Sequence, residues 1–388
     1  MPAPHSSYAS EIYLQGMMAA TTPGFTTDAT ALEDSARERM QPAPFWYVAG
    51  GAGSGSTVRA NSAAFDRWRL VPRMLSGATG PELSCTVLGT PMPAPIITAP
   101  IGVQSIVHPE GELAVARAAA ELGVPMALST LSSHTLEQVA EASGDGPRWF
   151  QLYWPNDEEI CGSFLSRAKA AGYSALLLTL DTWQLGWRPH DLDSGYLPFL
   201  TGAGLATYFS DPVFCAGLAK PPLEDLPAAL LRWLPMFTGV DHTWDQLAFI
   251  RARWDGPIAL KGIQHVDDAR RAADAGMDGV VVSNHGGRQV DGAIASLDAL
   301  PAIAEAVGHR VEVLFDSGIR TGSDVLKALS LGARAVLLGR PWVYGLAHDG
   351  QAGVRHVLRS LLADLEITLG LAGHRTTAEL TQDALRAC

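Results

Sequence analysis

Eight short apolar runs alternate with helix-like stretches along the chain from about Ala94 onward. Each helix-like stretch has apolar residues at helical spacing and a glycine at or beside its end, where a left-handed helix cap belongs. Eight successive β-α units predict an α/β fold, a closed (β/α)8 TIM barrel, because a doubly wound sheet seldom needs so many strands. The predicted strands are PIITAPI, PMALST, RWFQLYW, SALLLTLD, PIALKGI, DGVVVSN, VEVLFDS and RAVLLGR.

Two segments lie outside this alternation. We expect residues 1–90 to form an N-terminal helical extension that caps the barrel of residues 91–388, so that 1–388 is a single domain. Residues 189–245 separate the fourth and fifth predicted strands. A connection of this length is usually functional, and its leucines and aromatic residues favour packing over disorder. We therefore predict a lid-like insertion after strand 4.

Composition argues against several classes of function. Apolar residues make up 47% of the chain and charged residues 18%, which is typical of a soluble globular protein with a large core. The net charge is −12 without any block of lysine or arginine, so we expect no nucleic-acid or membrane partner. No apolar run approaches the roughly 20 residues of a membrane span, and Met1 is not followed by a signal-peptide pattern. We expect a cytoplasmic protein.

The cysteines are widely separated and form no CxxC pair. This spacing favours free thiols in a reducing compartment over disulfides or metal ligands, and no metal site is expected. The four residues are Cys85, Cys161, Cys215 and Cys388.

Polar residues follow nearly every predicted strand. The carboxyl ends of barrel strands converge on one mouth, where barrel enzymes place their active sites. A single polar strand end is ordinary, but so many together predict an active site. They are Gln151 and Tyr153 at the end of strand 3, Thr179 and Asp181 at the end of strand 4, Lys261 at the end of strand 5, Ser283, Asn284 and His285 at the end of strand 6, Asp316 at the end of strand 7, and Gly339 and Arg340 at the end of strand 8.

The last two strand ends indicate a phosphate site. DSGIRTG and GRP supply backbone N–H groups, two arginines and a helix start in the corner where such barrels commonly bind phosphate, although glycine-rich segments also serve as plain turns. Lys261 suits the same ligand, because a cation facing an electron-rich ring stabilises a reduced, anionic cofactor. Pairing of Lys261 with a barrel carboxylate is the alternative.

The segment SNHGGRQ contains the candidate base, His285. A histidine at a strand end can accept a proton near neutral pH, the two glycines allow a ligand to approach, and Asp181 could hold the ring. A lone histidine is more often structural, but this one has arginines and tyrosines predicted at the same mouth. A receptor for a carboxylate with a neighbouring hydroxyl would comprise Tyr47, Tyr153, Arg188 and Arg288.

Taken together, SNHGGRQ, FDSGIRTG, LGRP, FQLY, TLDT and LKGI resemble the FMN-dependent 2-hydroxy acid oxidases and dehydrogenases. The resemblance covers nearly the whole chain, and the combination of motifs in this order is highly specific. Further segments, among them EIYLQG, YVAGGAG and TLDTWQLGWRPHDL, resemble the lactate 2-monooxygenases within that family.

The resemblance implies a role for each matched residue. His285 would accept the proton with support from Asp181, and Tyr47, Tyr153, Arg188 and Arg288 would hold the substrate. Leu131 stands where some members carry a larger aromatic residue, which leaves side-chain specificity open. The implied FMN contacts are the backbone of Pro100, Ile101 and Gly102; the polar groups of Ser129, Gln151, Thr179 and Ser283; Lys261 beside the ring; and Asp316, Ser317, Gly318, Ile319, Arg320, Gly339 and Arg340 at the ribityl chain and phosphate.

The implied reaction is oxidation of a small L-2-hydroxy acid with O2, in the monooxygenase form converting lactate to acetate, CO2 and water. A simple oxidase or dehydrogenase that gives a 2-keto acid and H2O2 from another hydroxy acid is the alternative, and transfer as hydride or carbanion stays open. A flavin-free barrel for a phosphorylated substrate and a non-catalytic binding barrel are more distant alternatives. Family members commonly form tetramers, so the resemblance implies a homo-oligomer, a tetramer or octamer.

Overall fold

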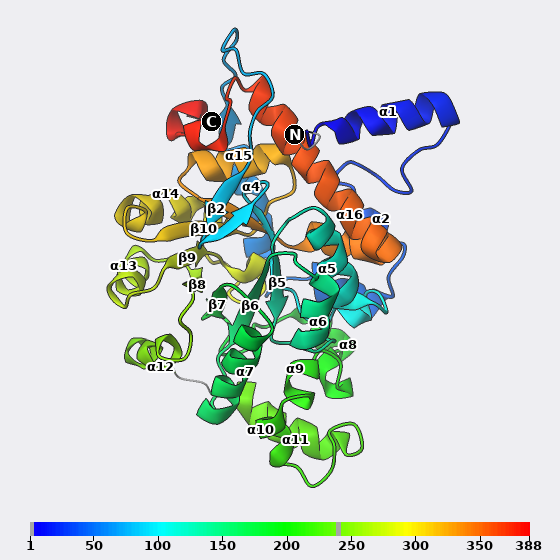
Figure 1. Cartoon of the computed structure of the whole chain (residues 1–388), viewed down its shortest axis with the longest axis vertical. Helices are drawn as coiled ribbons and strands as arrows, with labels where there is room; N and C mark the ends of the chain where they lie inside the picture. The colour runs from blue at the N-terminus through cyan, green and yellow to red at the C-terminus, as the bar shows by residue number, and fades with distance from the viewer. Residues whose placement is uncertain (1–3, 238–241) are drawn as a thin grey trace.

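A closed barrel of eight parallel strands forms the centre of the molecule (Figure 1). The structure is a computed structural model that describes residues 4–237 and 242–388. The barrel order is β10-β11-β4-β5-β6-β7-β8-β9, and each strand falls within one of the predicted runs. The strands are β4 (Ile96–Thr98), β5 (Met126–Ser129), β6 (Arg148–Tyr153), β7 (Leu176–Thr179), β8 (Ile258–Ile263), β9 (Gly279–Val282), β10 (Glu312–Asp316) and β11 (Ala335–Leu338). The predicted TIM barrel is confirmed.

Helices surround the barrel, and side chains cap several of their N-termini. Thr135 and Gln138 form a capping box, and the Asp157 carboxylate accepts the N–H groups of Glu159 and Ile160. These caps fix where each helix begins after the loop that leaves a strand end. The helices between or after barrel strands are α5 (Gly111–Glu121), α6 (Leu136–Ser143), α7 (Glu158–Ala170), α12 (Leu247–Arg251), α13 (Val266–Asp274), α14 (Ser296–Val307), α15 (Gly322–Ser330) and α16 (Arg340–Leu371).

The N-terminal 90 residues are helical at first and then form short strands. The helices are α1 (Ser7–Ala19), α2 (Leu32–Arg37), α3 (Pro42–Ala49) and α4 (Ser56–Asp66). β1 (Trp68–Leu70) pairs with the C-terminal β12 (Leu385–Ala387), and β2 (Cys85–Val87) pairs with β3 (Thr90–Met92). The expectation of a helical extension therefore missed these strands, whose partners lie at the far end of the chain or across a two-residue turn.

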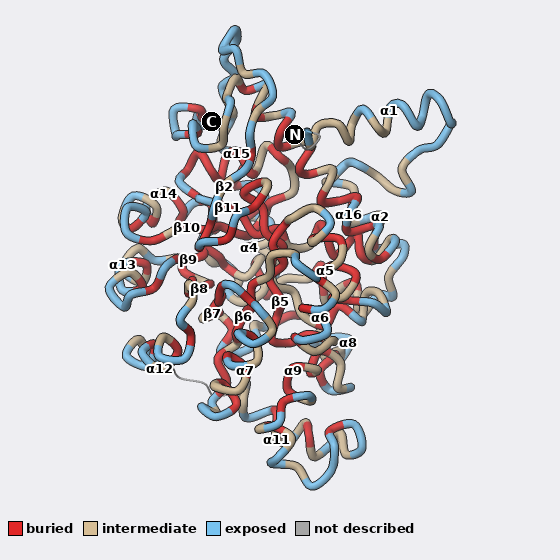
Figure 2. Tube along the Cα trace, in the orientation of Figure 1, coloured by how far each residue is buried: buried red, intermediate tan, exposed pale blue. Residues whose placement is uncertain are grey.

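The β2–β3 hairpin packs against the side chains inside the barrel, whose strands are buried (Figure 2). Val87, Leu88 and Met92 share one apolar cluster with the barrel residue Trp149. The Trp149 indole donates a hydrogen bond of 2.9 Å to the Thr90 hydroxyl. The hairpin therefore closes the barrel at the end opposite the carboxyl ends of the strands.

The predicted insertion after the fourth barrel strand is a set of short helices, and residues 238–241 of it lie outside the described residues. Phe199, Tyr208 and Phe214 of this segment are buried, as expected for a packed insertion. Its elements are α8 (Pro189–Ser194), η2 (Pro198–Thr201), α9 (Ala206–Phe209), α10 (Pro212–Ala216), α11 (Leu226–Phe237) and η3 (Trp244–Gln246).

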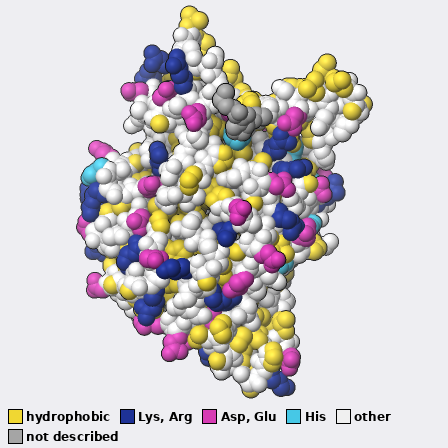
Figure 3. Space-filling model, in the orientation of Figure 1, with side chains coloured by type: hydrophobic (Ala, Val, Ile, Leu, Met, Phe, Trp, Pro, Cys, Tyr) yellow, Lys and Arg dark blue, Asp and Glu magenta, His cyan; other side chains and the backbone are white. Residues whose placement is uncertain are grey.

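Four further 3-10 turns complete the described structure: η1 (Gln104–Ile106), η4 (His285–Gly287), η5 (Thr377–Glu379) and η6 (Gln382–Ala384). Helix α1 projects from the body (Figure 1), and hydrophobic side chains are visible on it in Figure 3. Met17 and Met18 of this helix are exposed. All four cysteines are free thiols. Among the described residues, no helix is long and apolar enough to cross a membrane.

Replacing Trp149 with alanine should destabilise the barrel strongly. The change removes a fully buried side chain and leaves the Thr90 hydroxyl without its indole donor, so we expect the free energy of unfolding to fall by about 3–5 kcal/mol. Urea denaturation, monitored by circular dichroism, measures the change in the free energy of unfolding. The control is Trp187→Ala, whose side chain is 73% exposed and whose loss should cost no more than about 0.5 kcal/mol. Equal losses in the two variants would contradict this account of the barrel core.

Candidate active site

A cavity opens at the carboxyl ends of the barrel strands, and most of the predicted site residues line it. Gln151, Thr179, Asp181 and Ser283 do not line the cavity, but each lies at a strand end beside a residue that does. The predicted residues in the lining are Tyr47, Pro100, Ile101, Gly102, Ser129, Tyr153, Arg188, Lys261, His285, Arg288, Asp316, Ser317, Gly318, Ile319, Arg320, Gly339 and Arg340.

His285 lies at the centre of this mouth and is held from both sides of its ring. Its Nδ1 is 2.8 Å from Asp181 Oδ1 and 3.1 Å from the hydroxyl of Thr182, which also donates to Asp181 Oδ1 at 3.0 Å. On the other side, Nε2 is 3.5 Å from the Tyr153 hydroxyl. Asp181 therefore favours the tautomer with the proton on Nδ1, which leaves Nε2 facing the cavity as an acceptor.

The backbone at His285 is unusual and fixes the ring. His285 has a φ of +57°, and Gly286 and Gly287 follow with φ of +64° and +75°. A Cβ on Gly287 would lie 2.7 Å from the backbone nitrogen of Val58 in α4, so only glycine allows this approach. The 3-10 turn η4 is thus held between β9 and the N-terminal extension, and His285 is turned into the mouth.

Charges around the pair set its protonation. Burial lowers the pKa of His285, and attraction from Asp181 offsets this only in part, so the imidazole is neutral near pH 7. Burial raises the pKa of Asp181, but His285 and the Lys261 ammonium outweigh it, and the net pKa lies below its ordinary value. The result is a neutral base beside an ionised carboxylate, the arrangement that general-base chemistry requires.

Arginines gather around the cavity without carboxylate partners. Among the described residues, no Asp or Glu oxygen forms a salt bridge with any of them. Burial and the charges of Arg188 and Arg340 lower the pKa of Arg288 to about 9. Buried cations that repel one another are relieved by an anionic ligand, which is the chemistry a carboxylate substrate and a phosphate-bearing cofactor would bring. The four residues are Arg188, Arg288, Arg320 and Arg340.

Backbone carbonyls orient two of these arginines. The Arg340 guanidinium donates to the carbonyls of Val48, Gly286 and Gly50 at 3.0, 3.0 and 2.9 Å, and Arg288 Nη1 donates to Gly50 at 2.8 Å. The carbonyl end of α3 thereby faces the cluster with its negative partial charge. The N-terminal extension is thus part of the candidate site, and it also supplies Tyr47, whose ring lies 5.3 Å from Arg288 Cζ.

Lys261 forms an ion pair and also lines the cavity. Its ammonium lies 2.9 Å from Asp316 Oδ2 and donates to the Ser283 hydroxyl at 3.0 Å. Burial lowers the pKa of Lys261, but Asp316 and Asp181 outweigh it, so the net pKa is raised and the side chain stays cationic. Lys261 thus pairs with a barrel carboxylate, which was the alternative left open by the sequence. It also lines the cavity, where its charge suits a flavin ring.

The segment from Pro100 to Gly102 lies against the loop after β5. The N–H of Val103 donates to the carbonyl of Leu131 at 2.8 Å, and a Cβ on Gly102 would lie 2.5 Å from that same oxygen. A glycine is therefore required for this approach. The buried Glu112 carboxylate accepts the N–H groups of Gln104 and Ser133 at 3.1 and 3.0 Å and holds the two loops together. The backbone of residues 100–102 is therefore held in place and could pack against a flat ligand.

The predicted phosphate corner differs from expectation in one respect. The start of α15 is already capped, because Asp324 Oδ2 accepts the N–H groups of Arg320 and Thr321 and Asp364 Oδ2 accepts that of Gly322. The helix start therefore offers few free N–H groups to a phosphate. We propose that the side chain of Arg320, with Arg340 and the backbone of the segment after β10, holds the phosphate instead.

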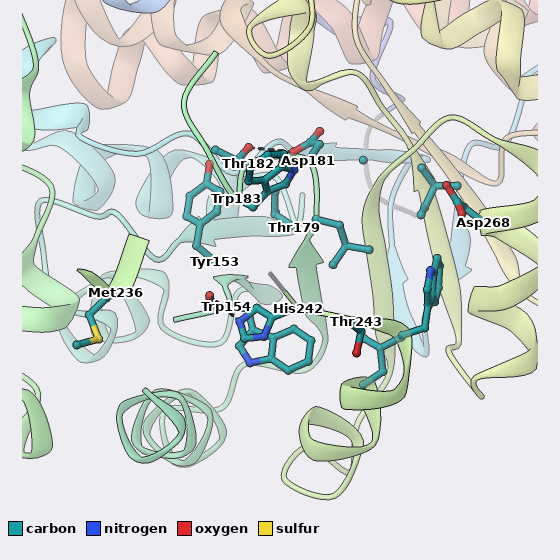
Figure 4. A pocket seen from close by; sticks show the side chains of 15 residues that line it. Tyr153, Trp154, Thr179, Asp181, Thr182, Trp183, Met236, His242, Thr243 and Asp268 are labelled. Carbon is teal, nitrogen blue, oxygen red and sulfur yellow. Dashed lines mark hydrogen bonds between the residues drawn. The ribbon is translucent and has the colours of Figure 1, made fainter. Parts of the chain in front are cut away.

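A second cavity lies on the far side of Asp181 and shares Tyr153 and Thr182 with the first (Figure 4). Trp154 and His242 stack in its wall with ring centroids 3.9 Å apart. No lysine or arginine occurs among the described residues that line it. An anionic substrate therefore belongs in the first cavity, with the arginines.

The chain belongs to the FMN-dependent dehydrogenase family, whose model matches residues 36–387, and its cofactor is FMN. It is 50% identical over 388 residues to an FMN-dependent alpha-hydroxy acid dehydrogenase of Penicillium citrinum, covering 99% of this chain and 96% of the relative. It is 43% identical over 345 residues to an L-lactate oxidase of Lysinibacillus sphaericus, covering 88% of each. The flavin-free and non-catalytic alternatives are excluded by this membership.

Solved structures give the same result. A crystal structure of mandelate oxidase superposes with a TM-score of 0.83 at 39% identity, covering 94% of this chain and 99% of that chain. The barrel and the elements that surround it are thus shared with an enzyme of the family. The chain is an FMN-dependent 2-hydroxy acid oxidoreductase.

Sequence reasoning left several contacts at the mouth unassigned. Leu185 and Phe199 line the cavity, and Thr182 contacts both Asp181 and His285. Thr182 stands in the TLDT segment, directly after the aspartate, and that adjacency could have drawn attention to it. Leu185 lies within TLDTWQLGWRPHDL and Phe199 lies in the insertion; both are apolar, so a search for polar residues at strand ends does not single them out.

Arg320→Ala should weaken binding of FMN to the apoprotein. Loss of a cation without an acidic partner at the proposed phosphate end should raise the Kd for FMN by about tenfold or more, which quenching of flavin fluorescence measures. Arg310→Ala is the matched control, since Arg310 lies at the surface and pairs with Asp274. An unchanged Kd in Arg320→Ala would show that the phosphate is held elsewhere.

Proposed function

We propose that His285 is the base that takes the hydroxyl proton from an L-2-hydroxy acid bound in the first cavity. Three features together carry this proposal: a neutral imidazole whose Nε2 faces the cavity, an ionised Asp181 at 2.8 Å from its Nδ1, and arginines that have no acidic partner among the described residues. FMN, when bound, supplies the acceptor for the two electrons that leave the substrate α-carbon.

Each side chain has a distinct part in this proposal. Arg188 and Arg288 bind the substrate carboxylate, which neutralises the repulsion between them. Tyr47 and Tyr153 orient the carboxylate and the hydroxyl group; burial raises the pKa of both phenols, so both remain proton donors. As the proton reaches Nε2, Asp181 stabilises the imidazolium.

The proposed substrate is small and aliphatic, such as L-lactate. Leu131, Leu185 and Phe199 supply apolar walls around the cavity, and Phe199 belongs to the insertion that follows the fourth barrel strand. We propose that this insertion retains the 2-keto acid after oxidation, because closure over a site excludes water and delays product release.

Retention would lead to a monooxygenase outcome. Peroxide formed from O2 would decarboxylate the keto acid in place, so that lactate and O2 give acetate, CO2 and water. The segments that resemble lactate 2-monooxygenases support this outcome. The alternative is release of the keto acid and H2O2, and it is favoured by relatives that are named L-lactate oxidase and 4-hydroxymandelate oxidase.

His285→Ala should keep FMN but lose most flavin reduction. Removal of the base should slow anaerobic bleaching of the flavin by L-lactate by about 10²–10⁴-fold in a stopped-flow experiment. His265→Ala is the control, since that histidine is exposed and lies outside the cavity lining. Flavin reduction at the wild-type rate in His285→Ala would disprove the assignment of the base.

The products from L-lactate in air decide between the two outcomes. The monooxygenase proposal predicts one acetate and one CO2 per O2 consumed, with little free pyruvate or H2O2. Chromatography of the acids together with an oxygen electrode measures this balance. Pyruvate and H2O2 in equal amounts would select the simple-oxidase alternative.

A further inference from the structure

Gln289 fills the space between two loops that carry the proposed catalytic residues. Its side-chain Nε2 donates to the carbonyls of Asp181 and Gln184 at 2.7 and 2.8 Å. Its Oε1 accepts from the N–H of Gly186 at 3.3 Å and from Arg188 Nη2 at 3.0 Å. Both donors and both acceptor positions of the amide are therefore used, and every partner lies between residues 181 and 188.

The backbones of the two loops also meet directly. A Cβ on Gly186 would lie 2.5 Å from the carbonyl oxygens of both Arg288 and Gln289, so the contact requires glycine at this position. Arg188 Nε donates to the Arg288 carbonyl at 3.1 Å. The loop after β7 is thus joined to the segment after η4 by contacts centred on Gln289.

The partners of Gln289 belong to two functions. Asp181 supports His285, whereas the Arg188 side chain lines the cavity as a carboxylate ligand. Gln289 itself does not line that cavity. We propose that Gln289 is a positioning residue that couples the acid–base pair to the carboxylate-binding arginine, so that substrate binding and proton abstraction depend on the same amide. This inference rests on the proposed function of His285 and Arg188.

The chemistry of the amide explains why glutamine is needed. Methionine has nearly the same length and volume but provides no strong hydrogen bond. Glutamate keeps the acceptor oxygen Oε1 but replaces the amide nitrogen with a second oxygen, so it loses the donors to the carbonyls of Asp181 and Gln184. It would also place a carboxylate against Arg188 and neutralise the guanidinium charge that we propose binds the substrate carboxylate. The two replacements therefore disturb the coupling in different ways.

The test uses the FMN holoenzyme and two separate measurements. The Kd for pyruvate, followed by the change in flavin absorbance, reports on Arg188 without turnover, and the anaerobic rate of flavin reduction at saturating L-lactate reports on His285. Gln289→Met should raise this Kd by about tenfold or more, the scale for losing a hydrogen bond to a charged group, here Arg188. It should lower this rate by about tenfold as well, because the backbone of Asp181 loses the amide that fixes it. Gln289→Glu should raise the Kd further than Gln289→Met does.

Gln264→Met is the matched control. The Gln264 amide also donates to a backbone carbonyl at this end of the barrel, that of Ile294 at 2.9 Å, but within the described structure it forms no hydrogen bond with the 181–188 loop. We expect the Kd for pyruvate and the rate of flavin reduction in Gln264→Met to lie within about twofold of wild type. The reason is that the loss of a single exposed hydrogen bond costs little free energy.

The proposal would be overturned if Gln289→Met had a Kd for pyruvate and a rate of flavin reduction within twofold of wild type. A lowered Tm with both of these values unchanged would overturn it too. Pyruvate binding by Gln289→Glu as tight as in wild type would overturn it as well, and this variant decides the matter if Gln289→Met does not fold. Because the Kd needs no proton transfer, a failure of the His285 assignment would show in His285→Ala while the effect of Gln289 on pyruvate binding persisted.

Discussion

The burial or partial burial of four arginines that have no acidic partner among the described residues is the constraint on which the rest of the mouth depends. A guanidinium removed from water is costly unless hydrogen bonds and a counter-charge replace its hydration. Here backbone carbonyls of Val48, Gly50 and Gly286 accept hydrogen bonds from Arg288 and Arg340. Burial and the neighbouring arginines still hold the pKa of Arg288 below its ordinary value. The remaining charge is the driving force for binding anions, in a protein whose net charge of −12 would otherwise repel them.

The same anion-binding charge shapes the acid–base pair. Burial lowers the pKa of His285 most, Asp181 raises it, and Lys261 and Arg188 lower it further, so the imidazole is neutral. A bound carboxylate would weaken the effect of Arg188 and so make His285 a stronger base once substrate is present. Substrate binding at Arg188 and the basicity of His285 are thus linked by electrostatics. The hydrogen bonds of Gln289 provide a second link.

Much of this structure could be predicted from local sequence. The eight barrel strands are continuous apolar runs, and the polar residues after them must meet at one mouth whatever the details of packing. This is why the sequence alone places His285, Asp181 and Lys261 at one mouth. FMN itself came from the resemblance of motifs, because a phosphate corner alone is compatible with many ligands.

What could not be predicted depends on contacts between distant segments. The carbonyls that orient Arg340 lie near residue 50, and the partner of β1 is the C-terminal β12, so neither leaves a local pattern. The capped start of α15 depends on Asp364, on another helix. Gln289 was visible within SNHGGRQ, but nothing in its neighbours along the chain indicates that its amide binds the 181–188 loop.

The central claim is that a 2-hydroxy acid binds between the arginine pair and His285. A crystal structure of the FMN holoenzyme with a bound 2-keto acid tests it most directly. We expect the ligand carboxylate to bind Arg188 and Arg288, and its keto oxygen to accept a hydrogen bond from the Tyr153 hydroxyl beside His285. A keto acid bound away from the arginines, for example in the second cavity beside Trp154, would contradict it.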